Sequence, residues 1–170
     1  GLLALLAAGL AMVQARGMGI NFLLSVLLLV WMADIAAYFA GRALGQRFIK
    51  VKLAPSISPG KSWEGALGGA VGVMLMAVLW VQCDAQLQPD SLSLFSHLAQ
   101  GGWALLVLAT LFLTAMSVLG DLVESLIKRS AGVKDSSQLL PGHGGVLDRI
   151  DALVPTLPLA MMLVSSVTVI

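Results

Sequence analysis

Charge is scarce in this chain. Asp, Glu, Lys and Arg together make up 11% of its 170 residues, while hydrophobic residues make up 58%. An ordinary soluble domain has about 25% charged residues, so the composition excludes a soluble globular protein and indicates an integral membrane protein. The net charge of +1 gives no indication of nucleic-acid binding.

Cysteine and histidine are almost absent as well. The single cysteine, Cys83, excludes an internal disulfide, and we expect it to be a small packing residue near a helix end. With only two histidines and no cysteine cluster, a zinc site is disfavoured. A metal bound by this chain would need oxygen ligands, which suit a hard cation such as Mg²⁺.

Long apolar runs dominate what remains. Four of them approach or exceed the roughly 20 residues needed to cross a membrane, at about residues 21–40, 63–81, 102–122 and 152–170, and a shorter run covers 2–13. The runs are unbroken rather than alternating, which favours helices over a barrel. We predict an all-α polytopic protein with about five transmembrane helices, in which residues 1–170 form a single transmembrane region.

The chain starts at Gly1 rather than Met, and no charged segment precedes its first apolar run. We therefore expect it to be the C-terminal part of a larger protein, and the first run is not expected to be a cleavable signal peptide.

Apart from Arg16, the Lys and Arg residues occur in two segments, at about 41–62 and 125–149, whereas the segment 82–101 between them has neither Lys nor Arg. By the positive-inside rule, both basic segments are predicted to be cytoplasmic loops. The alternatives for Arg47, Lys50 and Lys52 are that they only set the topology or that they contact anionic lipid headgroups.

Asp34 lies within the apolar run at about 21–40, about two turns before the cytoplasmic end of that run. A charged residue near a bilayer centre costs on the order of 2.5–3.5 kcal/mol on insertion scales, so it is expected to have a partner and a role. We interpret Asp34 as a site residue. The alternative is a neutral or hydrogen-bonded carboxyl group that holds helices together.

The segment 57–65, ISPGKSWEG, places Lys61 and Ser62 where the next helix is expected to begin. A phosphate-binding P-loop is disfavoured, because Pro55 replaces its first glycine and no strand is expected before it. A helix N-terminus still suits an anion. The equal alternative is that Ser62 caps the helix. The glycines that follow have the small-xxx-small spacing of tight helix packing, namely Gly65, Gly68, Gly69 and Gly72.

Acidic and basic side chains converge around the last basic loop. A helix is expected to continue beyond the apolar run at about 102–122. One face of it carries Asp121, Glu124, Ser125 and Lys128. Asp148 and Asp151 repeat an i, i+3 spacing where the last helix starts, just after a glycine-rich break at 141–145. Carboxylates beside Lys and Arg suit Mg²⁺ and phosphate groups, as in phosphoryl or nucleotidyl transfer. The alternative is structural: caps, dipole partners and a helix stop signal.

The segment from Ser125 to Asp151 reads SLIKRSAGVKDSSQLLPGHGGVLDRID. It resembles, without a departure, the signature of the phosphatidate cytidylyltransferases, also called CDP-diacylglycerol synthases. The region from Asp34 to Gly45, the SPGKSWEG segment and the GDLVESLIKR run also resemble that family's order of elements. The resemblance spans most of the chain and lacks only the family's N-terminal membrane portion.

The resemblance implies that phosphatidate attacks the α-phosphorus of CTP, with Mg²⁺ required and a second, monovalent cation possible. It implies a bacterial cytoplasmic (inner) membrane protein with its site facing the cytoplasm, contacts with membrane lipids, and a homodimer. The residues it implies as catalytic are Asp121, Lys128, Asp148 and Asp151, of which Asp121, Asp148 and Asp151 would hold the metal. Those implied to bind substrate are Asp34, Lys61, Ser62, Ser125, Arg129, His143, Gly144, Gly145 and Arg149.

Two alternatives remain open. CTP-dependent polyprenol kinases and archaeal lipid cytidylyltransferases resemble this family, and the motifs do not specify the acceptor. An ion-coupled transporter would use Asp34 and Asp121 as ion sites. It is disfavoured because the charge gathers at one membrane edge rather than along a path through the bilayer.

Overall fold

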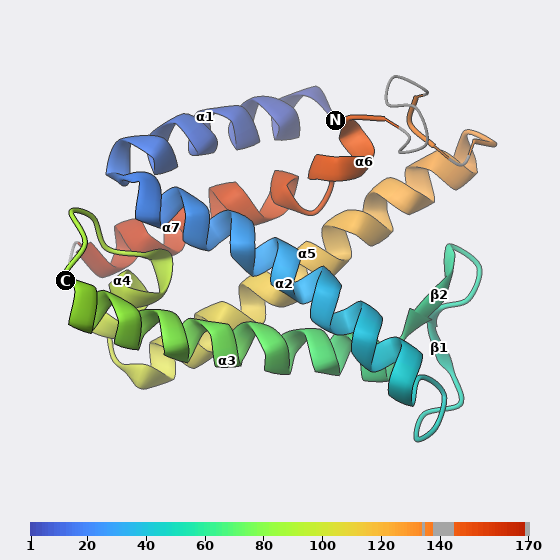
Figure 1. Ribbon diagram of the computed structural model, residues 1–170. Coiled ribbons are helices and arrows are strands. Elements are labelled where there is room, and N and C mark those ends of the chain that lie inside the picture. Colours follow the sequence, from blue (N-terminus) through green and yellow to red (C-terminus); the bar gives the residue numbers. More distant parts are fainter. Residues whose placement is uncertain (134, 138–144, 169–170) are drawn as a thin grey trace.

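The structure is a computed structural model, which describes residues 1–133, 135–137 and 145–168. Within these residues the chain is helical apart from one short β-hairpin (Figure 1). The elements, in chain order, are α1 (Leu2–Met18), α2 (Ile20–Leu44), β1 (Lys52–Ala54), β2 (Ser58–Ser62), α3 (Trp63–Leu87), α4 (Leu94–Gln100), α5 (Trp103–Ser130), α6 (Leu147–Ile150) and α7 (Leu153–Thr168).

Four helical segments are long and apolar enough to cross a membrane: Ile20–Leu44, Trp63–Leu87, Trp103–Ser130 and Leu147–Val167. The fifth apolar run forms α1, which is shorter. The prediction of an all-helical integral membrane protein is therefore confirmed. The hairpin is an addition that the apolar runs could not indicate, because its strands have only three and five residues.

The helices extend beyond the apolar runs. α2 continues to Leu44, α5 to Ser130 and α3 to Leu87, and the segment between α3 and α5 contains the short helix α4. Hydrophobicity ends where a helix leaves the lipid, whereas backbone hydrogen bonding does not have to end there. As a result, Asp34 lies ten residues, or about 15 Å, before the end of α2 rather than two turns.

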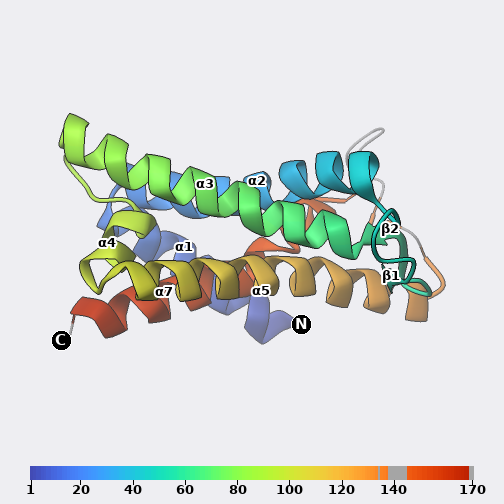
Figure 2. The same ribbon diagram turned by 90° about the horizontal axis from the view of Figure 1, so that it is seen from below.

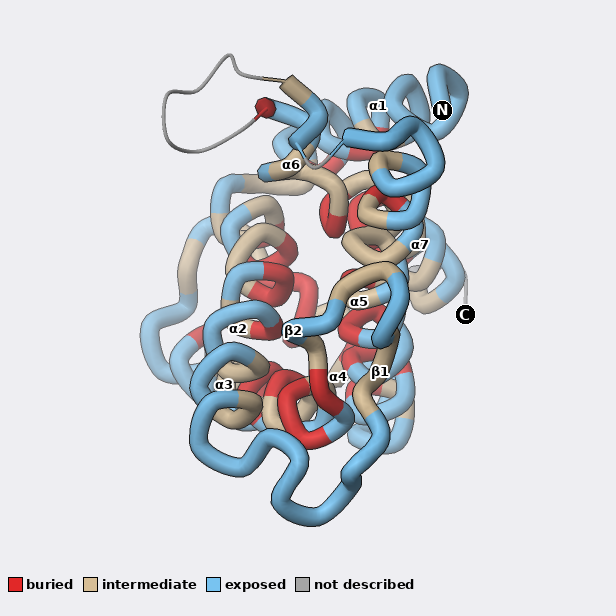
Figure 3. The backbone as a smooth tube through the Cα atoms, turned by 90° about the vertical axis from the view of Figure 1, so that its right-hand side faces the viewer, coloured by how far each residue is buried: buried red, intermediate tan, exposed pale blue. Residues whose placement is uncertain are grey.

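The spanning helices form two packed pairs. α2 lies along α3, and α5 lies along α7 on the other side of the bundle (Figure 2). Figure 3 shows that the buried segments lie on the inner sides of the helices, where Phe22, Leu29, Val73, Leu106 and Leu113 are fully buried. On the outer side of α3, the i, i+4 series Leu67, Val71, Leu75 and Leu79 is 59–61% exposed, as expected of a face in contact with lipid.

Glycines allow α2 and α3 to approach closely. A Cβ atom on Gly68 would lie 2.1 Å from the Cβ atom of Ala40, and one on Gly72 would lie 2.5 Å from that of Ala36. Such contacts are sterically impossible, so these positions need glycine at this helix spacing. The tight packing predicted from the glycine spacing is confirmed.

We expect Gly68→Val to destabilise the protein by about 1–3 kcal/mol, because overpacking pushes α2 and α3 apart. The matched control is Gly9→Val in α1, where an added Cβ atom meets nothing within 4 Å. Thermal unfolding of both full-length variants in detergent measures the difference. Equal losses in the two variants would contradict the proposed role of this helix contact.

The other end of the bundle contains a buried acid with a structural role. Asp84 accepts hydrogen bonds from Asn21 Nδ2 (2.9 Å), Ser93 N (3.0 Å) and Ser96 Oγ (2.5 Å). These bonds connect the start of α2, the end of α3 and the start of α4. Because both carboxylate oxygens accept hydrogen bonds from the protein, Asp84 stabilises this end of the bundle.

Candidate functional site

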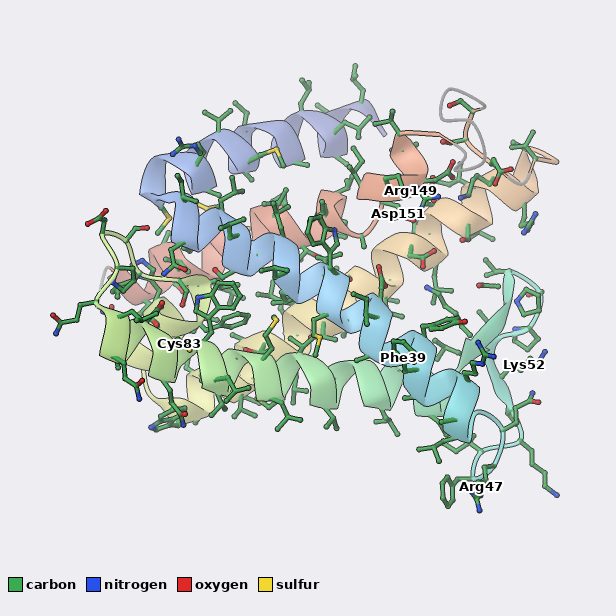
Figure 4. The ribbon with its side chains drawn as sticks, viewed as in Figure 1. Phe39, Arg47, Lys52, Cys83, Arg149 and Asp151 are labelled. Atoms are coloured by element: carbon green, nitrogen blue, oxygen red, sulfur yellow. The ribbon has the colours of Figure 1, made fainter. Side chains whose placement is uncertain are left out.

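The charged segments meet at one end of the bundle. The C-terminal ends of α2 and α5, the hairpin and α6 all lie there, so the two basic segments are on the same side of the molecule (Figure 1). In Figure 4, Arg47, Lys52 and Arg149 lie at this end, and Cys83 lies at the opposite end of α3. This arrangement is the one that the distribution of Lys and Arg predicts for a protein with one basic face.

A short hairpin carries Lys61 into the site. β1 pairs with β2 in antiparallel fashion, and β2 leads directly into α3. The expectation that no strand precedes Lys61 is therefore wrong, because local pairing around a tight turn forms the strand without an apolar pattern. Ser62 is the N-cap of α3, and its Oγ accepts a hydrogen bond from Gly65 N (3.1 Å). This bond favours the capping interpretation of Ser62.

Glu64 organises the connection from α2 to the hairpin. The residue is only 6% exposed, and its Oε1 accepts hydrogen bonds from Phe48 N (3.1 Å) and Ile49 N (2.8 Å). A buried carboxylate needs such donors to offset the loss of hydration. Glu64 thereby determines how the hairpin leaves the membrane-spanning part of the chain.

Lys61 connects the hairpin to α5. Its Nζ lies 2.5 Å from Oδ2 of Asp121, while Oδ1 of Asp121 accepts a hydrogen bond from Ser125 Oγ (3.2 Å). The two ion-paired side chains are 25% and 31% exposed, so this pair is partly hydrated. Both oxygens of Asp121 therefore have a partner, although neither partner is deeply buried.

Lys128 makes two ion pairs about two helical turns beyond Asp121 along α5. Its Nζ lies 2.8 Å from Oε2 of Glu124 and 2.6 Å from Oδ1 of Asp148. All three side chains are at most 16% exposed, so these charges are largely removed from water and depend on one another. Lys128 thus joins α5 to the short helix α6.

Asp148 also orders the loop that precedes it. Its Oδ2 accepts hydrogen bonds from Gly145 N (2.7 Å), Ser136 N (3.0 Å) and Ser136 Oγ (2.8 Å). Gly145 is buried, and a Cβ atom on it would lie 2.0 Å from Ser136 Oγ. The glycine at this position therefore allows a close contact within the loop. The carboxylate of Asp148 is fully engaged by Lys128 and by the loop.

Two further carboxylates lie around these ion pairs. Asp151 is within electrostatic range of Glu124 and Asp121, and Asp34 on α2 is within range of Asp121 and Lys61. Gly120 allows the approach of Asp151, because a Cβ atom there would lie 2.8 Å from the carbonyl oxygen of Asp151. Side chains from α2, the hairpin, α5 and α6 thus form one charged cluster, which we call the carboxylate–lysine cluster. Its members are Asp34, Lys61, Asp121, Glu124, Lys128, Asp148 and Asp151.

Glu124 was not among the predicted site residues. It is 8% exposed. Its Oε2 forms the ion pair with Lys128, and its Oε1 has no hydrogen-bond partner within the residues that the structure describes. The i, i+4 spacing of Glu124 and Lys128 is the sequence signal that indicates their ion pair. Buried and short of donors, the Glu124 carboxylate could accept another positively charged partner.

A cavity of about 530 Å³ opens beside the cluster, between α2, α3, α5 and the hairpin. Asp34, Arg42, Lys61 and Ser62 supply its charged and polar lining, and small or apolar residues supply the rest. Arg42 Nη1 donates a hydrogen bond to Tyr38 Oη (3.1 Å) on the same helix. Neither Arg42 nor Tyr38 was a predicted site residue, because nothing in the sequence shows that they face a cavity.

Some predicted residues lie elsewhere. Arg129 and Arg149 are exposed at the rim of the cluster, with Arg129 in the last turn of α5 and Arg149 in α6. His143 and Gly144 fall outside the described residues, as does Lys134.

The donor set suits a hard divalent cation, since it consists of carboxylates and includes Glu124, whose Oε1 has no hydrogen-bond partner in the described part of the chain. Within the described ranges, however, no three Asp, Glu, His or Cys side chains form a ready-made metal site. The contacts explain why: Lys61 and Lys128 hold three of the carboxylates in ion pairs. Metal binding here would require rearrangement of those ion pairs.

Known proteins resemble almost the whole chain. Residues 2–167 match the model of the cytidylyltransferase family. The phosphatidate cytidylyltransferase of Haemophilus influenzae is 49% identical over 140 residues, which cover 82% of this chain and 44% of the relative. The protein of the same name from Pseudomonas aeruginosa is 44% identical over 160 residues, covering 93% of this chain and 53% of the relative.

A third relative carries the same name. The phosphatidate cytidylyltransferase of Staphylococcus epidermidis is 41% identical over 150 residues, which cover 88% of this chain and 51% of the relative. The chain spans about half the length of the curated relatives it matches. With the family model matched from residue 2 to residue 167 and identities above 40% to three bacterial proteins, the chain belongs to the cytidylyltransferase family.

Proposed function

We propose that the full-length protein transfers a cytidylyl group from CTP to phosphatidate and is therefore a phosphatidate cytidylyltransferase. The observation that carries this proposal is the carboxylate–lysine cluster at the basic end of the bundle, in a chain whose relatives are named for this activity. Such a cluster supplies both the cation ligands and the phosphate-binding groups that nucleotidyl transfer needs.

In the proposed reaction, a phosphate oxygen of phosphatidate attacks the α-phosphorus of CTP. A new P–O–P linkage forms, the bond between the α-phosphorus and the oxygen bridging to the β-phosphate breaks, and pyrophosphate leaves. The phosphomonoester has a second pKa near 6 and is already largely dianionic at neutral pH, so the reaction needs no strong general base. Repulsion between two anionic reactants is the main obstacle that the protein must overcome.

We assign Asp121, Asp148 and Asp151 as the Mg²⁺ ligands, and Glu124 as their neighbour in the same charged environment. When bound, Mg²⁺ would neutralise charge on the substrate phosphates and on the departing pyrophosphate. Lys128 and the arginines at the rim, Arg129 and Arg149, would bind phosphate oxygens that the cation does not reach. The ion pairs of Lys128 support this assignment, because they hold its ammonium group inside the cluster.

We place the reaction at the cytoplasmic face of the inner membrane. Both basic segments lie at the end of the bundle that carries the cluster (Figure 4), and positive residues favour the cytoplasmic side. CTP would reach the cluster from the cytoplasm, and phosphatidate would enter sideways from the surrounding lipid. We further propose a homodimer and an additional monovalent cation.

The acceptor is tested directly. We expect the full-length protein in detergent, supplied with CTP labelled at the α-phosphate and with phosphatidate, to move label into the lipid phase in the presence of Mg²⁺. EDTA should abolish the transfer, because charge neutralisation is then lost. Parallel reactions contain a polyprenol and CTP labelled at the γ-phosphate. If only the polyprenol is labelled, the protein is a polyprenol kinase and this proposal is wrong. If EDTA does not reduce the transfer to phosphatidate, the assignment of metal ligands is wrong.

A further inference from the structure

The two lysines of the cluster are held differently. Lys128 contacts two carboxylates, and its side chain is only 16% exposed. Lys61 contacts one carboxylate, Asp121, and both members of that pair are partly hydrated. Lys61 also belongs to a two-stranded hairpin whose strands have three and five residues, whereas Lys128 belongs to a helix of 28 residues. Lys61 is therefore the cation that can leave the cluster at lower cost.

A divalent cation and the ammonium group of Lys61 would compete for the same atoms. The Lys61 Nζ lies 2.5 Å from Oδ2 of Asp121, and the other oxygen already accepts a hydrogen bond from Ser125. A cation in direct contact with that carboxylate needs a place within about 2.1–2.6 Å of an oxygen. Two positive charges at such a distance repel each other, so they cannot share this position.

We propose that Lys61 is an exchangeable counter-ion of Asp121, an inference that rests on the function proposed above. A divalent cation that binds Asp121 displaces the ammonium group, which then binds a substrate phosphate in the neighbouring cavity. Without the cation, Lys61 neutralises Asp121 and is not available to the substrate. Cation binding thus prepares both partners: the carboxylate receives the metal, and the lysine is released to the phosphate.

The cavity provides the destination. Lys61 lines it together with Arg42, and its volume of about 530 Å³ leaves room for a phosphate group. The hydrogen bond from Arg42 to Tyr38 keeps the guanidinium group on the cavity side of α2. A phosphate between Lys61 and Arg42 would receive two positively charged donors, which is the usual recognition of phosphate in proteins.

The first test measures cation affinity without catalysis. Full-length Lys61→Gln in detergent is titrated with Mn²⁺ alone, and free Mn²⁺ is followed by electron paramagnetic resonance. Removing the competing ammonium group should tighten Mn²⁺ binding by up to about fivefold. The matched control is Lys52→Gln on β1 of the same hairpin, since Lys52 makes no ion pair within the residues that the structure describes. The control should leave Mn²⁺ affinity unchanged.

The second test uses CTP in the presence of saturating Mn²⁺. Lys61→Gln should weaken CTP binding about tenfold, because a charged phosphate donor is lost. Opposite effects on the two ligands distinguish exchange from structural damage, which would weaken both. Unchanged or weaker Mn²⁺ binding in Lys61→Gln would overturn the exchange, and unchanged CTP binding would overturn the phosphate role of Lys61.

Two further measurements keep the proposal falsifiable if Lys61→Gln does not fold. Lys61→Met retains the aliphatic stem of the side chain and should show the same pair of effects. In addition, an experimental structure of the wild-type protein with Mn²⁺ at Asp121 should show Lys61 Nζ beyond ion-pair distance of that carboxylate. An intact ion pair in that structure would refute the exchange. None of these measurements requires turnover, so failure of the cytidylyl transfer assay would be distinguishable from failure of this inference.

Discussion

Asp121→Asn is expected to lower the rate of cytidylyl transfer by about 100-fold or more, since the carboxylate proposed to hold the charge-neutralising cation is removed. Asp121 sits between the hairpin and the acidic residues of α5 and α6, in contact with Lys61 and Ser125. The asparagine amide oxygen can still accept the Ser125 hydrogen bond, so the local shape is retained. The initial rate of label transfer into lipid at saturating CTP measures the effect.

Stability should change little in the same variant. The Lys61–Asp121 pair is partly hydrated, and pairs of this kind contribute roughly 0–1 kcal/mol. Thermal unfolding in detergent separates the two effects. The control is Asp90→Asn, an exposed acid in the segment between α3 and α4, which should retain full activity. A large loss of stability in Asp121→Asn, or an activity near that of the control, would contradict the role assigned to Asp121.

Lys128→Met is expected to affect both activity and stability. It leaves Glu124 and Asp148, whose side chains are 9% and 10% exposed, without their shared cation. Breaking a buried ion pair by removing one partner typically costs about 3–5 kcal/mol. We expect the lower value here, because the side chain of Lys128 is still 16% exposed. We expect a stability loss of about 3 kcal/mol and a drop in activity of at least about 100-fold.

A double variant separates these two effects. Adding Glu124→Gln to Lys128→Met removes one of the uncompensated charges and should restore part of the stability without restoring activity. Lys50→Met, an exposed lysine in the loop that follows α2, is the control for loss of positive charge at this end of the bundle. Wild-type stability in Lys128→Met, or an active double variant, would show that the two ion pairs of Lys128 are not central to the cluster.

Local patterns in the sequence predicted several features well. The apolar runs predicted the spanning helices, and the glycine spacing predicted the close contact at Gly68 and Gly72. The i, i+3 and i, i+4 positions of α5 predicted that its charged residues share one face, as the Glu124–Lys128 pair shows. All of these features depend on helix geometry alone, which residue spacing determines.

Other features depend on how separate elements meet. The hairpin, the pairing of Lys61 with Asp121, and the bonds from Asp148 to Ser136 and Gly145 join residues that the sequence pattern does not connect. Asp84 is a clear case. Nothing in the sequence distinguishes it from other acidic residues, and only its three hydrogen-bond donors show that its role is structural.

Composition and residue spacing are enough to predict a helical membrane protein with most of its charge near one membrane edge, because charged side chains are costly in lipid and are kept out of the long apolar runs. Which charges neutralise one another follows instead from the way the elements pack. Ion pairs need atoms within a few ångströms, and that proximity arises from the packing of α2, α5, α6 and the hairpin, which no single segment encodes.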